Sequence, residues 1–345
     1  MHRISNQRTA CEGGRVCGDK SFGSLGRTSR VSRAPVRRSK RKSRASSVNS
    51  EIRKPETNSH ERISPTAWSL AYRRSLTDIP YSSGIFEELR KILRRTRSAA
   101  EIQELDELVR PEITPMFEAR FKLMNRLLRQ RSARQILEIA AGFSPRSMDF
   151  ARDSSVEYAE MDLPGMIKEK RAVVEELIKQ SKIPRYPNVH FYSGDALNPE
   201  DLLAATKLFR NEPIAVVNEG LLRYLSFGEK AIVAQNVHKL LERFGGVWMT
   251  PDLSVRPEGT LGLPEEKMKE LNDRIERITG IEIGKNYFEN EGAARAFFEN
   301  IGFAIERHGF LEAASELVSP QKLGLTPVQV EKGLKGHAVF VMTLD

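Results

Sequence analysis

Cysteine and long apolar runs are scarce in this sequence. The two cysteines, Cys11 and Cys17, both lie near the N-terminus of the 345 residues. This excludes a disulfide-stapled secreted domain, and it excludes a cysteine-based zinc site in the rest of the chain. Because no stretch approaches the ~18 consecutive apolar residues that a membrane-spanning helix needs, we expect no membrane partner. The sequence predicts a cytoplasmic protein without a metal site, and it indicates no oligomeric state.

Acidic residues are scarce at the N-terminal end, and this decides where the basic charge lies. The formal net charge of the chain is +9. Residues 1–66 carry 16 Lys and Arg against 5 Asp and Glu, whereas residues 67–345 carry 39 against 41, a net charge of −2. The basic excess is therefore confined to the first segment. This distribution argues against a folded basic domain that covers a nucleic-acid backbone.

Large apolar residues are few in residues 1–66, which are rich in Arg, Ser and Gly. Such a segment cannot bury enough apolar surface to offset the entropy of ordering, so we predict a disordered tail. Three interpretations stay open: an extension without function, a tether for nucleic acid or another anionic surface, and an organelle transit peptide. The segment lacks an apolar core of about 7–15 residues, which excludes a secretory signal.

Two kinds of periodicity divide the rest of the chain. Residues 67–132 are predicted to be helical, because apolar residues recur at helical spacing, and Pro111 and Pro115 indicate a break between helices. Strands are then predicted at Gln135–Ile139, Val156–Met161, Val189–Tyr192, Ile214–Asn218, Val247–Thr250, Phe303–Arg307 and His337–Thr343. Helices are predicted at Pro145–Arg152, Gly165–Gln180, Pro199–Leu208, Gly228–Arg243 and Glu291–Asn300. This alternation is typical of an α/β fold, a parallel sheet with helices on both faces.

Ligands of such sheets bind beyond the carboxyl ends of the strands, so the residues that follow each strand are candidates. After the first strand, Gly142 would let the backbone turn sharply and approach a ligand. Asp162 follows the second strand, 20 residues after Gly142, where an acidic residue would accept hydrogen bonds from ribose hydroxyls. The alternatives are a plain strand-to-helix turn at Gly142 and an aspartate that caps the next helix.

The third and fourth strands are also followed by acidic residues. Asp195 would accept a hydrogen bond from an adenine amino group, with Ala196 against the ring, although a turn aspartate in a Gly-Asp pair is the alternative. Glu219 ends a nearly all-apolar strand, where a charge is costly unless it is paired. A cationic ligand would supply that partner.

The turn after the first strand holds one glycine, followed by Phe143 and Pro145. A dinucleotide-binding dehydrogenase needs G-x-G-x-x-G at this point to admit a pyrophosphate. A nucleoside ligand without phosphates fits this turn better, and S-adenosyl-L-methionine is such a ligand.

Five segments match the motifs of one family. They are Thr66-Ala67 with Ala71 and Arg74, Arg120–Asn125, Glu138–Arg146, Asp162-Leu163-Pro164 with Lys170, and Glu219–Leu225. On these motifs, residues 66–345 resemble the leucine carboxyl methyltransferase-like family of class I S-adenosyl-L-methionine-dependent methyltransferases. That family includes bacterial O-methyltransferases linked to polyketide biosynthesis. The last two motifs, in this order and at this spacing, are quite specific.

The resemblance implies a Rossmann-like α/β fold with a doubly wound, mostly parallel seven-stranded sheet whose last strand is antiparallel. It implies that residues 67–132 form an N-terminal helical cap and that residues 255–288, an insertion after the fifth strand, complete the cap. It also implies a set of cofactor contacts. These are Arg120 to the methionine carboxylate, Gly142 to the methionine moiety, Asp162 to the ribose, Asp195 and Ala196 to adenine, and Glu219 to the amino end or the reaction centre.

Three residues depart from the family pattern. Ser144 and Asn125 stand where an aspartate is usual, and Arg223 occupies a position that is often apolar. These departures concern the substrate class more than cofactor binding. Arg223 would either receive an acidic substrate or be an exposed loop arginine, and the sequence favours the exposed arginine.

The resemblance implies O-methylation of a carboxyl or hydroxyl group on a small molecule. An ionised carboxylate needs no general base, whereas a phenol or alcohol is helped by one. His190, His308 and Tyr224 are weak candidates for a base, because each is more often structural, so no catalytic residue is assigned. The alternatives are a nucleic-acid-associated methyltransferase that uses the basic tail, a noncatalytic cofactor-binding module, and a dehydrogenase.

Overall fold

The computed structural model describes residues 65–107, 109–253, 255, 265–279 and 281–345. The predicted tail, residues 1–66, lies outside these ranges except for its last two residues. Residues 256–264 and 280 of the predicted insertion lie outside them as well. In the described ranges, no helix is long and apolar enough to cross a membrane.

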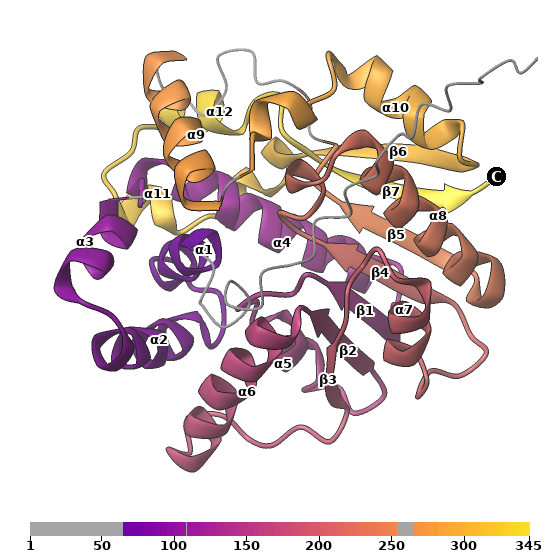
Figure 1. Ribbon diagram of the computed structural model, residues 1–345, viewed down its shortest axis with the longest axis horizontal. Helices are drawn as coiled ribbons and strands as arrows, with labels where there is room; N and C mark the ends of the chain where they lie inside the picture. Colours follow the sequence, from indigo (N-terminus) through magenta and orange to yellow (C-terminus); the bar gives the residue numbers. More distant parts are fainter. Residues whose placement is uncertain (1–64, 108, 254, 256–264, 280) are drawn as a thin grey trace, which may run out of the picture. The chain divides into compact units, whose positions relative to one another are not determined.

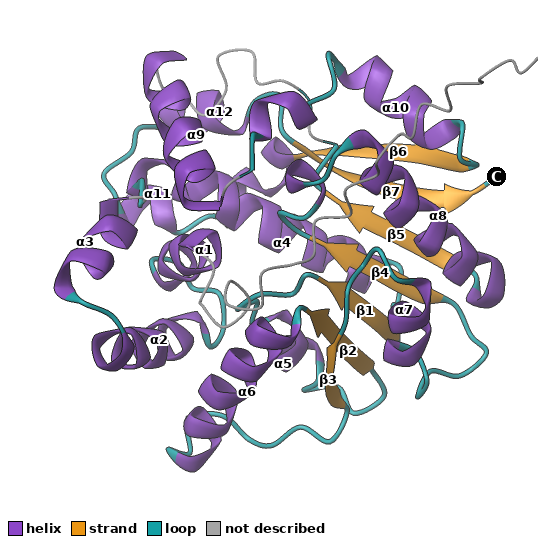
Figure 2. Cartoon of the chain, viewed as in Figure 1, coloured by secondary structure: helices purple, strands orange, loops and turns teal. Residues whose placement is uncertain are grey.

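Within the described residues, seven strands form one sheet (Figures 1 and 2). They are β1 (Gln135–Ile139), β2 (Glu157–Asp162), β3 (Val189–Ser193), β4 (Ile214–Asn218), β5 (Gly246–Thr250), β6 (Phe303–Gly309) and β7 (Ala338–Leu344). Their order across the sheet is β3-β2-β1-β4-β5-β7-β6. All pairs are parallel except those of β7, which runs antiparallel to β5 and β6. The predicted mostly parallel sheet with an antiparallel last strand is confirmed.

Helices connect most of the strands, as the sequence predicts. They are α5 (Arg146–Phe150), α6 (Pro164–Lys179), α7 (Pro199–Ala205), α8 (Phe227–Phe244) and α10 (Glu291–Glu299). The helix α7 ends at Ala205, before the predicted Leu208, and the amide of Thr206, its C-cap, donates to the carbonyls of Leu202 and Leu203. The helix α5 also ends two residues early, at Phe150.

Further helices lie N-terminal to the sheet and in its later connections. The N-terminal set is α1 (Pro65–Ser75), α2 (Ser82–Thr96), α3 (Ala99–Glu107), the 3-10 turn η1 (Pro111–Ile113) and α4 (Thr114–Gln130). The later set is η2 (Leu222–Tyr224), α9 (Glu265–Thr279), η4 (Ile283–Asn286), η5 (Phe310–Glu316), α11 (Ser319–Lys322) and α12 (Pro327–Leu334). Pro111 opens η1 and Pro115 lies in the first turn of α4, so the chain breaks between helices where the two prolines indicate.

Both faces of the sheet are buried, which explains why its strands have nearly continuous apolar sequences. Side chains alternate along a strand, so Leu137 and Ile139 pack with α7, α8 and α10, whereas Ile136 packs with α4, η5 and α12. A third cluster joins α1 and α2 to α6, with Trp68 fully enclosed. Figure 1 shows helices on both sides of the sheet, and α1 contacts α4. The arginines of α1 and α4 discussed below are therefore held on a packed scaffold.

His337, in the turn before β7, makes stability depend on pH. Its ring stacks on Phe310 with 5.6 Å between ring centroids. Burial, helped by the charges of Arg120 and Arg307, lowers the pKa of His337 from 6.5 to about 4. Between these values the unfolded chain binds the proton more tightly than the folded chain does. The free energy of unfolding should therefore fall by about 1–3 kcal/mol as the pH drops from 6.5 towards 4.

The substitution His337→Phe keeps a stacked ring and removes the titrating group. Urea titrations at several pH values should show a flatter loss of stability below pH 6.5 for this variant than for the wild type. Equal slopes in the two proteins would contradict the assignment of this pH dependence to His337.

Candidate active site

The residues predicted to bind a ligand meet at one edge of the sheet. Gly142 follows β1, Asp162 ends β2, and Glu219 follows β4. Asp195 and Ala196 follow β3. These four strands are neighbours and parallel, so their carboxyl ends share one edge. The arrangement is that of ligand sites in doubly wound sheets.

Asp162 is fixed by the turn that follows β1. Its Oδ2 accepts a hydrogen bond from the Gly142 amide at 2.8 Å, and its Oδ1 accepts one from the Leu163 amide, also at 2.8 Å. Burial raises the pKa of Asp162, and the two amide donors oppose that shift. Each carboxylate oxygen keeps a lone pair for another donor. Gly142 itself has φ +50°, a conformation that favours glycine.

Lys170 stabilises the same turn through its Nζ. The Lys170 Nζ donates to the Gly142 carbonyl at 3.1 Å and to the Ser144 carbonyl at 2.6 Å, and it pairs with Glu160 at 2.6 Å. The Ser144 hydroxyl accepts from the Arg146 amide at 3.3 Å. The departure at Ser144 therefore leaves a short polar side chain just before α5, and it adds no charge to the turn.

The loop after β3 is closely packed. Asp195 is exposed, and its Oδ1 accepts from the Leu197 amide at 2.9 Å, which is the turn geometry that the sequence offered as an alternative. Ala196 is buried, and its carbonyl accepts from Asn236 Nδ2 at 3.1 Å. A Cβ on Gly194 would lie 2.9 Å from the Cβ of Asp201, so this position requires glycine. The loop thus presents Asp195 to solvent above a buried alanine.

Glu219 is the centre of a buried ion-pair cluster. Its Oε2 accepts from Arg120 Nε at 2.9 Å and from Arg74 Nη2 at 3.1 Å, and its Oε1 pairs with Arg146 Nη2. The three guanidinium groups hold the pKa of Glu219 far below its usual range, against the effect of burial. The sequence indicated that a ligand would pair with this charge. That expectation is corrected: the chain supplies the cations itself.

The cluster continues through Arg146, which is fully buried. Arg146 Nη1 pairs with Glu138, and its Nε donates to Asn125 Oδ1 at 2.7 Å. Glu138 also accepts from the Tyr158 hydroxyl at 2.8 Å. Asn125 thus binds the guanidinium without the charge that an aspartate would add. Three arginines and two glutamates leave one positive charge in excess, which favours an anion at this site.

Arg120 is the arginine of this cluster whose guanidinium has N–H donors left for a ligand. It is 8% exposed, and its guanidinium lies 4.8 Å from the ring centroid of Phe117. Only Nε is engaged, by Glu219; across the described part of the chain, Nη1 and Nη2 make no hydrogen bond. Two parallel N–H donors are what a carboxylate accepts best. The geometry therefore fits the predicted contact with a methionine carboxylate.

Buried hydrogen bonds connect the loops after β4 and β5. Asp252 Oδ2 accepts from the Leu221 amide at 2.7 Å and from Asn218 Nδ2 at 3.1 Å. The indole of Trp248 donates to Asn218 Oδ1 at 2.8 Å. Burial raises the pKa of Asp252, whereas the charge of Arg120 and the Leu221 amide lower it. The backbone that carries Glu219 and η2 is therefore held in place by buried bonds.

The exposure of Arg223 differs from that of the exposed loop arginine that the sequence favours. It is half-buried rather than exposed, and its Nη2 donates to the Tyr287 hydroxyl at 3.2 Å. Tyr287 comes from the 255–288 insertion, whose ends meet in a bridge between Val255 and Phe288. The sequence missed this burial because the covering residue lies 64 positions away.

Two of the three candidate bases are paired with glutamates elsewhere. His190, in β3, pairs with Glu157, and His308, in β6, contacts Glu306 at 2.9 Å. Tyr224 lies in η2, and the guanidinium of Arg223 is 5.6 Å from its ring centroid. Tyr224 is thus the candidate that stands at the carboxyl end of β4.

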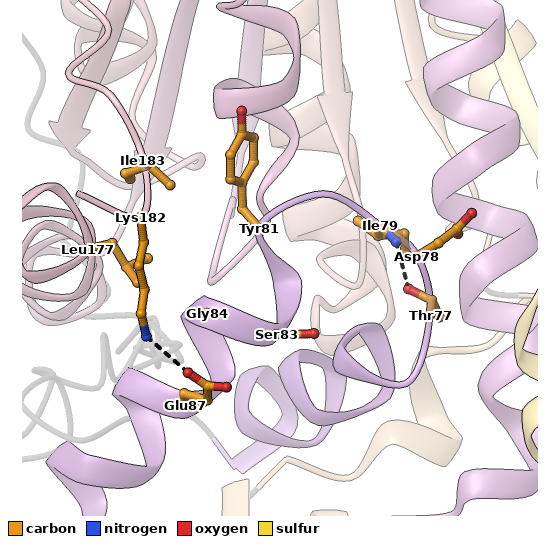
Figure 3. A pocket seen from close by; sticks show the side chains of 10 residues that line it. All are labelled: Thr77, Asp78, Ile79, Tyr81, Ser83, Gly84, Glu87, Leu177, Lys182 and Ile183. Atoms are coloured by element: carbon orange, nitrogen blue, oxygen red, sulfur yellow. Dashed lines mark hydrogen bonds and ion pairs between the residues drawn. The ribbon is translucent and has the colours of Figure 1, made fainter. Parts of the chain in front are cut away.

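A surface cavity of about 440 Å³ lies between the beginning of α2 and the end of α6 (Figure 3). It is lined by the turn between α1 and α2, by the first turns of α2, and by residues of and after α6, among them Tyr81, Glu87, Leu177 and Lys182. Lys182 Nζ donates to Glu87 Oε2 at 3.0 Å across it. None of the six predicted cofactor residues lines this cavity.

A mostly parallel sheet of this order, with acidic and glycine residues at the carboxyl ends of β1 to β4, defines a class I methyltransferase fold. Residues 65–238, just over half of the chain, match the family model of the leucine carboxyl methyltransferases. The chain therefore belongs to the leucine carboxyl methyltransferase family. As a member it is a methyltransferase, and S-adenosyl-L-methionine is its cofactor.

Two solved structures superpose on this chain to different extents. A proposed methyltransferase from Thermobifida fusca YX is 14% identical and superposes with a TM-score of 0.51, over 86% of this chain and 100% of that chain. A DUF574 family protein from Streptomyces avermitilis MA-4680 is 15% identical, with a TM-score of 0.47 over 82% of this chain and 100% of that one. A comparison with curated proteins found no match.

Proposed function

We propose that the protein transfers a methyl group to a carboxyl or hydroxyl oxygen of a small molecule. The proposal places the cofactor against a set of six residues at the strand ends. They are Arg120, Gly142, Asp162, Asp195, Ala196 and Glu219. The main observation in its favour is that Glu219, paired with Arg120 of α4 at 2.9 Å, and Asp162, paired with Gly142 at 2.8 Å, lie at the same edge of the sheet, at the carboxyl ends of β4 and β2.

In this proposal Gly142 brings the backbone close to the methionine moiety, and each of the other five residues has its own task. The Nη groups of Arg120 bind the methionine carboxylate, and Glu219 holds that guanidinium in place through Nε. Asp162 accepts from the ribose hydroxyls, for which its oxygens are already oriented by two amides. Asp195 accepts from the adenine amino group, and Ala196 packs against the ring.

The cofactor supplies, when bound, an electrophilic methyl group on a sulfonium. The task of the chain is to orient the acceptor oxygen in line with that group and to exclude water. Such alignment is worth as much as roughly 7–11 kcal/mol of the barrier. A carboxylate acceptor, with a reference pKa of about 4, is already ionised at neutral pH and needs no base.

The substitution Asp162→Asn tests the cofactor site. It keeps the size of the side chain and replaces the charged acceptor, so we expect S-adenosyl-L-methionine to bind about 10–100-fold more weakly, as for loss of a hydrogen bond to a charged group. Calorimetric titration of the full chain gives the affinity. Asp106→Asn, on the exposed side of α3, is the matched control and should bind as the wild type does. A folded Asp162→Asn variant with wild-type affinity would contradict the site.

The reaction itself is tested with methyl-labelled cofactor and a panel of small carboxylic acids and phenols. Alkali-labile label indicates a methyl ester, and alkali-stable label on a phenol indicates an ether. A noncatalytic module would bind the cofactor and label nothing. A nucleic-acid-associated enzyme would instead label RNA and lose that activity steeply with added salt.

A further inference from the structure

Ala140, in the turn after β1, has a backbone conformation that alanine rarely adopts. Its φ is +53°, in the left-handed region, which glycine enters at no steric cost and alanine enters only with strain. The turn leads from β1 to Gly142, at the edge of the sheet where the predicted ligand residues gather. Strained residues of this kind persist where the surrounding structure holds them, and they cluster at ligand sites. The conformation of Ala140 therefore needs a physical reason.

The termination of a helix is not that reason. Three other residues of the described ranges that are not glycine have a positive φ, and each stands at a helix end. Tyr81 is the N-cap of α2, and Ser132 and Ser181 lie just past the ends of α4 and α6. After each serine, the next amide donates back to a helix carbonyl, at 3.1 Å and 2.9 Å, which is a common way for a helix to end. Ala140 lies between a strand and a turn, at no helix end.

Packing of the core is not the reason either. Ile139 and Ala141, on either side of Ala140, are buried, whereas Ala140 and Gly142 are half-buried. Ala140 belongs to none of the three apolar clusters that the described residues form. A glycine at this position would relieve the strain and take no side chain from the core. We infer that the methyl group of Ala140 serves a contact with a ligand.

The register of the sheet places Ala140 between the two carboxylates of the site. The residue before it, Ile139, pairs with the residue before Asp162 on β2 and with the residue before Glu219 on β4. The order along this edge is therefore Asp162, Ala140, Glu219. In the proposed function the ribose binds Asp162, and the methionine carboxylate binds Arg120, which Glu219 holds. The chain that joins these two ends of the cofactor carries the sulfur, and it has to pass Ala140.

Resting on the proposed function, we propose that Ala140 is a specificity-determining residue for the cofactor. Its methyl group packs against the sulfur-bearing chain, and it thereby favours nucleosides with sulfur on the 5′ carbon over nucleosides with a hydroxyl there. The carbons and the sulfur of a thioether gain from leaving water for an apolar surface. A hydroxyl at the same place would lose its hydrogen bonds to water and find only a methyl group in exchange. The strain at Ala140 is the cost of holding that methyl group in position.

The test is calorimetric titration of the full chain with three nucleosides. Methylthioadenosine and S-adenosylhomocysteine carry sulfur on the 5′ carbon, and adenosine carries a hydroxyl there. The wild type should bind methylthioadenosine more tightly than adenosine. Ala140→Gly should weaken both sulfur compounds about fourfold, the effect of one buried carbon, and leave adenosine unchanged. Ala140→Asn has a larger side chain that also tolerates the left-handed region, so it should weaken both sulfur compounds at least about 10-fold and adenosine less.

The thermal midpoint of the ligand-free protein is a second readout, because the strain and the ligand contact have opposite effects. Ala140→Gly removes the strain, partly offset by the larger entropy of the unfolded chain, so the midpoint should rise by about 1–3 °C while the sulfur compounds bind more weakly. Ser132→Gly is the matched control, because Ser132 has a φ of +52° at the end of α4. It should raise the midpoint by a similar amount and bind all three nucleosides as the wild type does.

Several results would overturn the proposal. If the wild type bound adenosine as tightly as methylthioadenosine, or if Ala140→Gly weakened both equally, the methyl group would not select for sulfur. Wild-type affinity for the sulfur compounds in both variants of Ala140 would exclude the contact. A lowered midpoint of Ala140→Gly would show that the methyl group serves the fold. A wild-type protein that fails to bind S-adenosylhomocysteine would instead overturn the proposed function.

Discussion

Glu219→Gln should lower the free energy of unfolding by about 3–5 kcal/mol, the cost of leaving buried charges without their partner. The carboxylate is 4% exposed and pairs with Arg74, Arg120 and Arg146. An amide of the same size cannot balance three guanidinium groups, of which, among the described residues, only Arg146 is ion-paired with another carboxylate, Glu138. Because whole domains are stable by only about 5–15 kcal/mol, the variant should be close to unfolding at 37 °C.

Urea denaturation of the two proteins measures this loss. Glu175→Gln, which breaks the exposed pair between Arg185 and Glu175, is the matched control and should unfold near the wild-type midpoint. Where Glu219→Gln still folds at low temperature, it should also bind S-adenosyl-L-methionine more weakly, because Arg120 loses the acceptor that orients it. If Glu219→Gln had the same midpoint as the control, the ion-pair cluster would not have the stabilising role assigned to it.

Gly246→Ala should lower the free energy of unfolding by about 3 kcal/mol or more. Gly246 opens β5 with φ +106°, and a Cβ there would lie 1.9 Å from the Ile214 carbonyl oxygen and 2.7 Å from the Ile214 nitrogen. Both atoms belong to the backbone of β4, which cannot yield as a flexible side chain would. The register of β4 on β5, and with it the position of Glu219, should be disturbed.

The preceding residue supplies the control. Gly245 also has a positive φ, +73°, but a Cβ there would have no atom within 4 Å. Gly245→Ala should therefore cost about 1 kcal/mol, the penalty for the backbone conformation alone. The difference between the two denaturation midpoints measures the close approach at Gly246. Equal losses of stability would show that the backbone conformation, and not the contact of Gly246 with β4, causes the loss in both variants.

The strands of the sheet could be predicted because the apolar runs that specify them lie within short stretches of chain. All five residues of β1 and of β4 are buried, and burial on both faces demands apolar runs that a sequence displays directly. The positions of Gly142, Asp162, Asp195 and Glu219 could also be predicted, since parallel strands bring their carboxyl ends to one edge.

The partners within the site could not be predicted in the same way. Arg74 and Glu219 are 145 positions apart, and Arg120 and Glu219 are 99 apart. No periodicity relates such residues, because only the packing of α1 and α4 brings them together. The sequence did contain one signal: Glu138, inside a buried strand, requires a cation nearby, and Arg146 is that cation.

By itself, the sequence determined the fold class, the strand order along the chain, the family motifs and the edge at which the ligand residues gather. Each of these depends on patterns within a short stretch of chain. Only the tertiary structure decided which charges are balanced. It gave Glu219 three arginines where a ligand was expected, and it buried Arg223 against Tyr287 where an exposed side chain was favoured. The cost of a charge depends on its surroundings in space, and those come from segments far apart in the chain.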